Sequence, residues 1–113
     1  MKVAIIGSRS ISRINRLEEY VPRDVSLIIS GGARGVDQIA KQFARAHGLP
    51  LREFLPDYTA FGRSAPLVRN LEIIEAADLV LAFWDGRSRG TQFVVLHCRA
   101  KGVPYRLFRS CPP

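Results

Sequence analysis

The chain has 113 residues and a formal net charge of +7, and 47% of its residues are apolar. That length fits one domain and is too short for two ordinary ones, and the apolar share excludes a globally disordered chain. No apolar run approaches the ~18 residues of a membrane span, so we expect no membrane partner. We expect a single domain over residues 1–109, followed by a frayed tail at 110–113.

Strand-like and helix-like segments alternate along the chain. In chain order, the sequence predicts a strand at 2–7, a helix at 11–21, a strand at 26–30, a helix at 36–47, a strand at 51–55, a loop at 56–64, a helix with Pro66 in its first turn, a strand at 79–84, a loop at 85–90, a helix at 91–100 and a strand at 103–108. The first segment has one charge and no cleavage site of small residues, which is typical of a buried strand rather than a signal peptide.

This alternation predicts βαβ units and a parallel sheet with helices on both faces. The segment 79–84 is almost wholly apolar, as a central parallel strand should be. We expect an α/β fold, a Rossmann-like three-layer α/β/α sandwich with a five-stranded parallel sheet in the order 3-2-1-4-5. That order reverses direction between strands 1 and 4, and ligands bind at such a switch point, outside the carboxyl ends of the strands.

Three loops at those carboxyl ends carry the unusual residues of this sequence. They are 7–10 after strand 1, 30–35 after strand 2 and 85–91 after strand 4, and together they hold six glycines and four arginines. Glycine lets backbone N–H groups approach an oxyanion closely, and a helix that starts just after the loop adds unpaired N–H groups and the positive end of its dipole. The alternative is that the glycines only make tight strand-to-helix turns.

Arginine dominates the basic residues, with 14 arginines against 3 lysines. The guanidinium is a planar fork that grips phosphate bidentately, so this bias indicates phosphates, nucleotides or nucleic acid as partners, unless the arginines only solvate the surface. The carboxylate of Asp37 could accept hydrogen bonds from the hydroxyls of a ribose, or it could simply be an acidic residue favoured near the N-terminus of its helix. The candidate ligand-binding residues are Gly7, Ser8, Arg9, Ser30, Gly31, Gly32, Arg34, Gly35, Asp37, Arg63, Arg69, Asn70, Asp85, Ser88, Arg89, Gly90 and Thr91.

Other site classes find little support in the sequence. There is no Walker loop and no dinucleotide fingerprint after strand 1, and no Cys/His pair has zinc spacing, so no metal site is expected. Two cysteines, Cys98 and Cys111, are too few for a disulfide framework. We interpret both as reduced thiols and expect a cytoplasmic protein.

The run 93–96 is apolar at four consecutive positions of a predicted helix. One helix face cannot bury all four against the sheet, and a helix that is apolar most of the way round is buried on two sides. We therefore expect the helix 91–100 to form the interface of a homo-oligomer, a dimer or a larger assembly.

Five motifs follow one another along the chain: Gly7-Ser8-Arg9, the run from Ser30 to Asp37, Gly62-Arg63 with Arg69-Asn70, Ala77-Asp78, and Asp85-Gly86 with the run from Ser88 to Thr91. In this order they resemble the SLOG superfamily, and they are most similar to its branch of small YspA/YpsA-related SLOG proteins. The run from Ser30 is also similar to the glycine loop of DNA-processing protein A. The resemblance implies a Rossmann-like fold that binds nucleotides, nucleotide-derived signals related to ADP-ribose, or single-stranded DNA. It also implies that Gly31, Gly32, Arg34 and Gly35 carry phosphate, with Gly90 and Thr91 facing them.

One departure from the superfamily concerns catalysis. The LONELY GUY phosphoribohydrolases have a glutamate in the pattern Gly-Thr-x-x-Glu, and Val94 holds that place here. Valine cannot transfer a proton, so that hydrolase activity is disfavoured. We expect a binding module for a nucleotide such as NAD, ADP-ribose or AMP. The alternatives are a hydrolase acting on the glycosidic or phosphate bond of a nucleotide, and a single-stranded DNA-binding protein.

Overall fold

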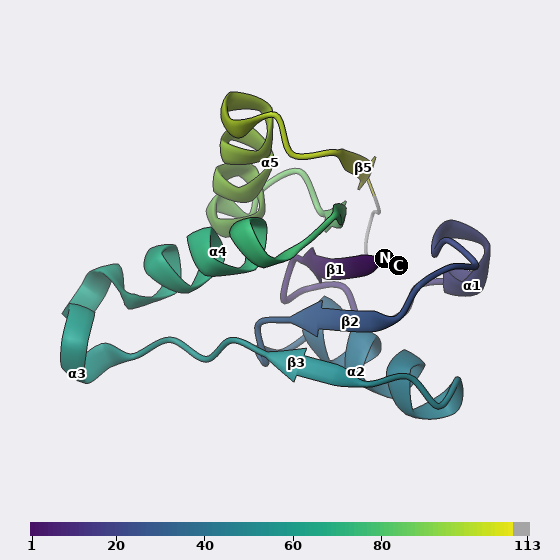
Figure 1. The fold of residues 1–113 in the computed structure, drawn as a ribbon. Coiled ribbons are helices and arrows are strands. Elements are labelled where there is room, and N and C mark those ends of the chain that lie inside the picture. Colours follow the sequence, from purple (N-terminus) through teal and green to yellow (C-terminus); the bar gives the residue numbers. More distant parts are fainter. Residues whose placement is uncertain (110–113) are drawn as a thin grey trace.

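The computed structural model describes residues 1–109, so the expected frayed tail and Cys111 lie outside the described residues. At its centre is a five-stranded sheet in the order β3-β2-β1-β4-β5, in which every pairing is parallel (Figure 1). The strands are β1 (Lys2–Gly7), β2 (Leu27–Ser30), β3 (Leu51–Glu53), β4 (Leu79–Trp84) and β5 (Tyr105–Arg109). The predicted α/β fold and strand order are confirmed.

The apolar residues of the central strand β1 divide between the two faces of the sheet. Because successive side chains of a strand point to opposite faces, Val3 and Ile5 lie on one face and Ala4 and Ile6 on the other. All four are buried. A strand buried on both faces has to be continuously apolar, which is why this segment shows no polar alternation.

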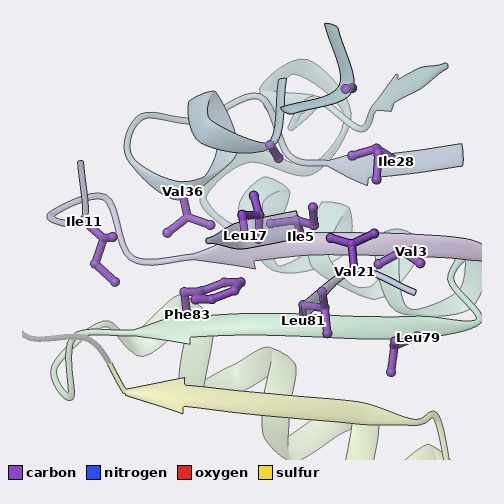
Figure 2. Close-up of a cluster of buried hydrophobic side chains, with 12 residues drawn as sticks. Val3, Ile5, Ile11, Leu17, Val21, Ile28, Val36, Leu79, Leu81 and Phe83 are labelled. Carbon is purple, nitrogen blue, oxygen red and sulfur yellow. The ribbon is translucent and has the colours of Figure 1, made fainter. Parts of the chain in front are cut away.

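The helices cover both faces, as a parallel sheet requires. The short α1 (Leu17–Tyr20) and α2 (Val36–Ala46) pack on the face of Val3 and Ile5, and Figure 2 shows the side chains of this cluster. The other face is covered by α4 (Ala65–Ala76) and α5 (Arg89–Lys101), which supply apolar residues to the second core cluster. Among the described residues, no helix is long and apolar enough to span a membrane.

The helix predicted at 11–21 is wrong over most of its length. Only Leu17–Tyr20 is helical, and the residue before it, Arg16, has a left-handed backbone with φ of 59°. The apolar spacing that suggested a helix is nevertheless used for burial, because Ile11, Leu17 and Val21 all enter the core (Figure 2). The apolar side chains of this segment are buried against the sheet, although most of its backbone is not helical.

The loop predicted at 56–64 is also wrong, because it contains α3 (Tyr58–Phe61) and a 3₁₀ turn, η1 (Gly62–Ser64). Asp57 caps α3 by accepting a hydrogen bond from the backbone N–H of Ala60 at 3.0 Å. Such a cap satisfies one of the free N–H groups of a helix and makes one turn possible without buried apolar contacts. This turn carries the chain from β3 to the start of α4 (Figure 1).

Candidate functional site

A cleft of about 610 Å³ lies at the carboxyl ends of β1 and β2, between the N-terminal halves of α4 and α5. This is the switch point that the strand order predicts, because β2 and β3 lie on one side of β1 and β4 and β5 lie on the other. Eleven of the predicted site residues line the cleft: Gly7, Arg9, Gly31, Asp37, Arg63, Arg69, Asn70, Asp85, Ser88, Gly90 and Thr91.

Two glycines hold the loops of this edge close together. A side chain on Gly7 would collide with the backbone carbonyl of Phe83 on the neighbouring strand. Gly35 has a φ of 73°, and a Cβ there would lie 2.5 Å from the carbonyl oxygen of Ser8 and 2.6 Å from that of Arg9. Both glycines are therefore required by the packing of backbone on backbone.

The loop after β4 is organised by Asp85. Its Oδ1 accepts hydrogen bonds from the backbone N–H groups of Arg87 and Ser88 at 2.8 Å, and its Oδ2 accepts one from the hydroxyl of Ser10 at 2.7 Å. The Ser10 hydroxyl, followed by these two N–H groups, holds the pKa of Asp85 well below its usual range. The backbone N–H of Asp85 in turn donates to the hydroxyl of Ser8 at 3.0 Å. The carboxylate thus fixes a loop and leaves neither oxygen without a donor.

The N-terminus of α5 opens into the cleft. Ser88 caps the helix, because its hydroxyl oxygen accepts a hydrogen bond from the backbone N–H of Thr91 at 3.3 Å and lies 3.1 Å from the Thr91 hydroxyl. Within residues 1–109, no hydrogen bond engages the backbone N–H groups of Arg89 and Gly90. Free N–H groups at a helix N-terminus, together with the helix dipole, make this end of the cleft attractive to an anion.

Arg69 is the most buried arginine of the cleft, with 8% of its surface exposed. Its Nη1 donates to the carbonyl oxygen of Gly31 at 2.6 Å and to that of Phe54 at 3.5 Å, and its Nε donates to Asn70 Oδ1 at 2.9 Å. Nη2 forms no hydrogen bond within residues 1–109. Arg69 lines the cleft, and Nη2 is not fully covered, because every fully covered side-chain nitrogen and oxygen atom of that part of the chain has a partner.

Asp37 faces Arg69 across the backbone of Gly31. A Cβ on Gly31 would lie 2.8 Å from Arg69 Nη1 and 3.0 Å from Asp37 Oδ2. Burial raises the pKa of Asp37, although the backbone N–H of Ala33 donates to Oδ2 at 3.0 Å and the charge of Arg69 also opposes the rise. Burial likewise lowers the pKa of Arg69, while the charge of Asp37 counteracts this. Both side chains thus lie against the start of the glycine loop at Gly31.

Six predicted site residues lie outside the lining of the cleft. Ser30 is the last residue of β2, Ser8, Gly32 and Gly35 are in the loops after β1 and β2, and Arg34 and Arg89 are exposed. Ser8 and Ser30 are fully buried and use their hydroxyls on Asp85 and on the backbone of Asp37. For Arg34, the role of phosphate ligand stays a prediction from the sequence.

Ile6, Ile73 and Val94 form an apolar part of the lining, and of these only Val94 was singled out from the sequence, by the resemblance. These residues belong to the second core cluster, and no pattern in the sequence distinguishes a core residue that also faces a cavity. Ser10 was missed as well, although it follows the candidate residue Arg9 directly. Its place in the loop after the first strand was the available signal.

Other reactive groups do not form a second centre. No cluster of three or more metal-ligating side chains occurs within residues 1–109. Cys98 is a free thiol that is fully buried in the core, and burial raises its pKa to about 11. A thiol of that pKa is almost entirely protonated near neutral pH, so it is a poor nucleophile.

Comparisons with known proteins agree with this architecture. Residues 1–61 match the model of the YspA, cpYpsA-related SLOG family. The Gene 61 protein of Mycobacterium phage D29 is 36% identical over 92 residues, which is 76% of this chain and 74% of the phage protein. No solved structure matches at a significant level. The family match covers β1 to α3, including the loops after β1 and β2 that form one wall of the cleft, and the chain belongs to the YspA, cpYpsA-related SLOG family.

Proposed function

We propose that this protein binds a nucleotide or nucleotide-derived ligand in the cleft, with a phosphate group against the N-terminus of α5. Membership of the SLOG family fits a nucleotide-related function of a Rossmann-like domain. The electrostatics of the cleft support the same ligand class. Arg9, Arg63 and Arg69 line it, whereas one of its two carboxylates, Asp85, already has donors on both oxygens.

The observation that carries this proposal is a glycine, Gly90, at a position where the fold has room for a side chain. It is the second residue of α5, its φ is not positive, and the nearest atom to a Cβ built there is Asn70 Nδ2, 3.9 Å away. The fold therefore has room for alanine at this position, and alanine favours a helix over glycine by about 0.5–1 kcal/mol. A glycine that the fold does not require, at the mouth of a helix with free N–H groups, is suited to close approach of a phosphate.

The proposed role is binding without turnover. Val94 lines the cleft, and in the sequence it holds the position of the glutamate of the LONELY GUY phosphoribohydrolases. Asp85 is a poor base because its pKa is lowered by three donors. Asp37 lines the cleft, but it accepts a hydrogen bond from the backbone N–H of Ala33 and lies beside Gly31 and Arg69. Neither carboxylate has a neighbouring histidine that lines the cleft within the described chain.

The variant Gly90→Ala tests the position of the phosphate. Isothermal titration calorimetry with AMP, ADP and ADP-ribose should show saturable binding to the unchanged protein and at least tenfold weaker binding to the variant. The Tm of the variant without ligand should be equal or higher, because a helix gains from alanine. Gln92→Ala, an exposed position of the same helix, is the matched control and should bind normally. Equal affinity of Gly90→Ala and the unchanged protein would move the phosphate away from α5.

The same titrations separate the proposed function from its alternatives. Chromatography of the nucleotide after incubation should return it intact, and release of base or phosphate would instead identify a hydrolase. Saturable binding of a single-stranded oligonucleotide with no response to any mononucleotide or to ADP-ribose would identify a nucleic-acid-binding protein, and its affinity would then fall steeply with salt.

A further inference from the structure

Exposed apolar side chains gather in the segment that connects β3 with α4. Seven large apolar side chains are exposed within residues 1–109, and four of them lie between residues 55 and 67: Leu55, Tyr58, Phe61 and Leu67. Single exposed apolar residues are common, whereas several in one short segment mark a surface that something covers. We infer that residues 55–64 form an arm that covers the aromatic base of a bound nucleotide, with Tyr58 and Phe61 as the side chains that contact the base. This inference rests on the proposed function and adds the residues that select the base.

The arm begins and ends at the cleft. At its start, the Leu55 side chain lies against the glycine loop, because its Cδ2 is 2.6 Å from the place of a Cβ on Gly32. At its end, Arg63 lines the cleft, and Leu67 on α4 lines it as well. Figure 1 shows α3, the middle of the arm, beyond the carboxyl ends of β2 and β3 and at the N-terminal end of α4. The arm therefore borders the cleft.

Little holds the middle of the arm to the rest of the protein. No residue of α3 or η1 is buried. Within residues 1–109, the only side-chain hydrogen bond of the arm is the cap that Asp57 places on its own helix. Gly62 has a φ of 55°, and a Cβ there would meet nothing within 4 Å. A segment with so few contacts changes position at little cost, so the arm can close on a ligand.

The lining of the cleft leads from the proposed phosphate position to the arm. It follows α4 from Asn70, whose Nδ2 lies 3.9 Å from the place of a Cβ on Gly90, to Leu67. These three residues of helix rise about 4.5 Å along the axis, and Arg63 continues the lining into the arm. A nucleotide that has its phosphate at the N-terminus of α5 and extends along α4 therefore reaches the arm with its base.

The arm is also where a base finds aromatic partners. No aromatic side chain lines the cleft within the described chain. Tyr58 and Phe61 are 59% and 47% exposed, so both rings have uncovered surface for a base, and aromatic rings stack on any base because every base has a π-face. Tyr58 is close to a charged residue of the cleft: burial lowers the pKa of Arg69, the charge of Asp37 opposes this decrease most, and Tyr58 opposes it as well.

The experiment compares AMP with ribose 5-phosphate, which has the same sugar and phosphate and lacks the base, by calorimetry on the full chain. AMP should bind at least tenfold more tightly. The double substitution Tyr58→Ser with Phe61→Ser should weaken AMP binding at least tenfold and change ribose 5-phosphate binding less than twofold. The exchange Tyr58→Phe with Phe61→Tyr keeps both rings and should bind AMP within twofold of the unchanged protein. Leu107→Ser, at an exposed apolar residue of β5, is the matched control and should leave both affinities within twofold.

The possible failures can be distinguished. If ribose 5-phosphate binds as tightly as AMP, or if the double serine variant binds AMP normally, the base does not contact the arm and the inference is overturned, while the proposed function stands. If the serine variant changes the sedimentation coefficient and leaves the affinity for AMP unchanged, the arm is a contact between copies of the chain, and the inference is likewise overturned. If no nucleotide binds to the unchanged protein, the proposed function fails and the inference fails with it. Circular dichroism and Tm of each variant verify that the fold is intact before the affinities are compared.

Discussion

The guanidinium of Arg69 on α4 donates to the carbonyl oxygen of Gly31, 38 residues earlier in the chain, at 2.6 Å. This bond fastens the glycine loop after β2 to the helix on the other side of the cleft. Since Arg69 also lines the cleft, the same residue holds the loop in place and would lie beside the proposed ligand. Substitutions at Arg69 therefore change stability and binding together.

We predict that Arg69→Met lowers the free energy of unfolding by about 1–3 kcal/mol, the range for leaving a buried acceptor without its donor. The carbonyl oxygens of Gly31 and Phe54 lose their donor, and Asp37 loses the charge that faces it. Urea denaturation followed by circular dichroism measures the change. Arg63→Met, at an exposed position of the same cleft, is the control and should lose little stability. Equal stability of both variants would show that the bond to Gly31 contributes nothing.

A second prediction concerns pH. Burial raises the pKa of Asp37 in the folded protein, so between the unfolded and folded pKa values the folded state binds more protons than the unfolded state. Asp37 therefore favours folding most at acidic pH, and this contribution is lost as the pH rises through the folded pKa. The variant Asp37→Asn, which keeps an oxygen for the N–H of Ala33, should gain stability relative to the unchanged protein as the pH rises from 4 to 7. Urea titrations at several pH values give the difference, and a constant difference would contradict the raised pKa.

Two glycines with a positive φ, Gly35 beside the cleft and Gly48 after α2, should lose different amounts of stability on substitution by alanine. Gly35→Ala should cost at least about 2 kcal/mol of stability, because it combines a positive φ with collision against two backbone carbonyls that cannot move aside. Gly48 also has a positive φ, 64°, but a Cβ there meets nothing within 4 Å. Gly48→Ala should therefore cost only about 1 kcal/mol, the strain of a left-handed residue. Thermal and urea unfolding measure both, and equal losses would show that the contact with Ser8 and Arg9 is unimportant.

The homo-oligomer expected from the run 93–96 stays a prediction. Val94 and Val95 are buried in the core, whereas Leu96 is 53% exposed and Phe93 stacks on His97 at 3.9 Å between ring centroids. Half of the apolar run is thus explained within one chain, and Leu96 is the residue that a partner would cover. We predict that Leu96→Glu shifts the protein to a monomer in sedimentation velocity at high concentration. A monomer before the substitution would remove the basis for the interface.

The sheet could be predicted because its signals are local and agree with one another. Continuous apolar runs at 2–7 and 79–84 can only be buried on both faces, and the helices between strands then require parallel pairing. The segment 11–21 misled because its apolar spacing matches a helix, although the left-handed Arg16 confines the helix to one turn. Neither backbone angles nor the cap on α3 by Asp57 can be read from hydrophobic periodicity.

The sequence predicted where the candidate site lies, but it did not predict what each residue of the site contacts. In the sequence, Gly35 and Gly90 both precede helical residues and look alike. In the structure, a Cβ on Gly35 would collide with two backbone carbonyls, whereas a Cβ on Gly90 would meet only Asn70 Nδ2 at 3.9 Å, so the packing of the protein requires glycine only at the first. In the same way, Asp85 was expected beside a ligand, and its oxygens are already used on Ser10 and two backbone N–H groups. Such roles depend on long-range neighbours.

The hydrogen bond between Ser10 and Asp85 spans 75 residues of sequence. It joins the loops that follow the first and fourth strands, which are neighbours in the sheet only because β4 pairs with β1. During synthesis, the loops after β1 and β2, which form one wall of the cleft, are made well before the loop at 85–91, which forms the opposite wall. The cleft is thus completed only after residues 85–91 have been made, and a nascent chain that stops at β4 has the sheet edge without α5. Because long-range contacts of this kind form late, recovery of ligand binding should lag behind recovery of helix content when the protein refolds from urea.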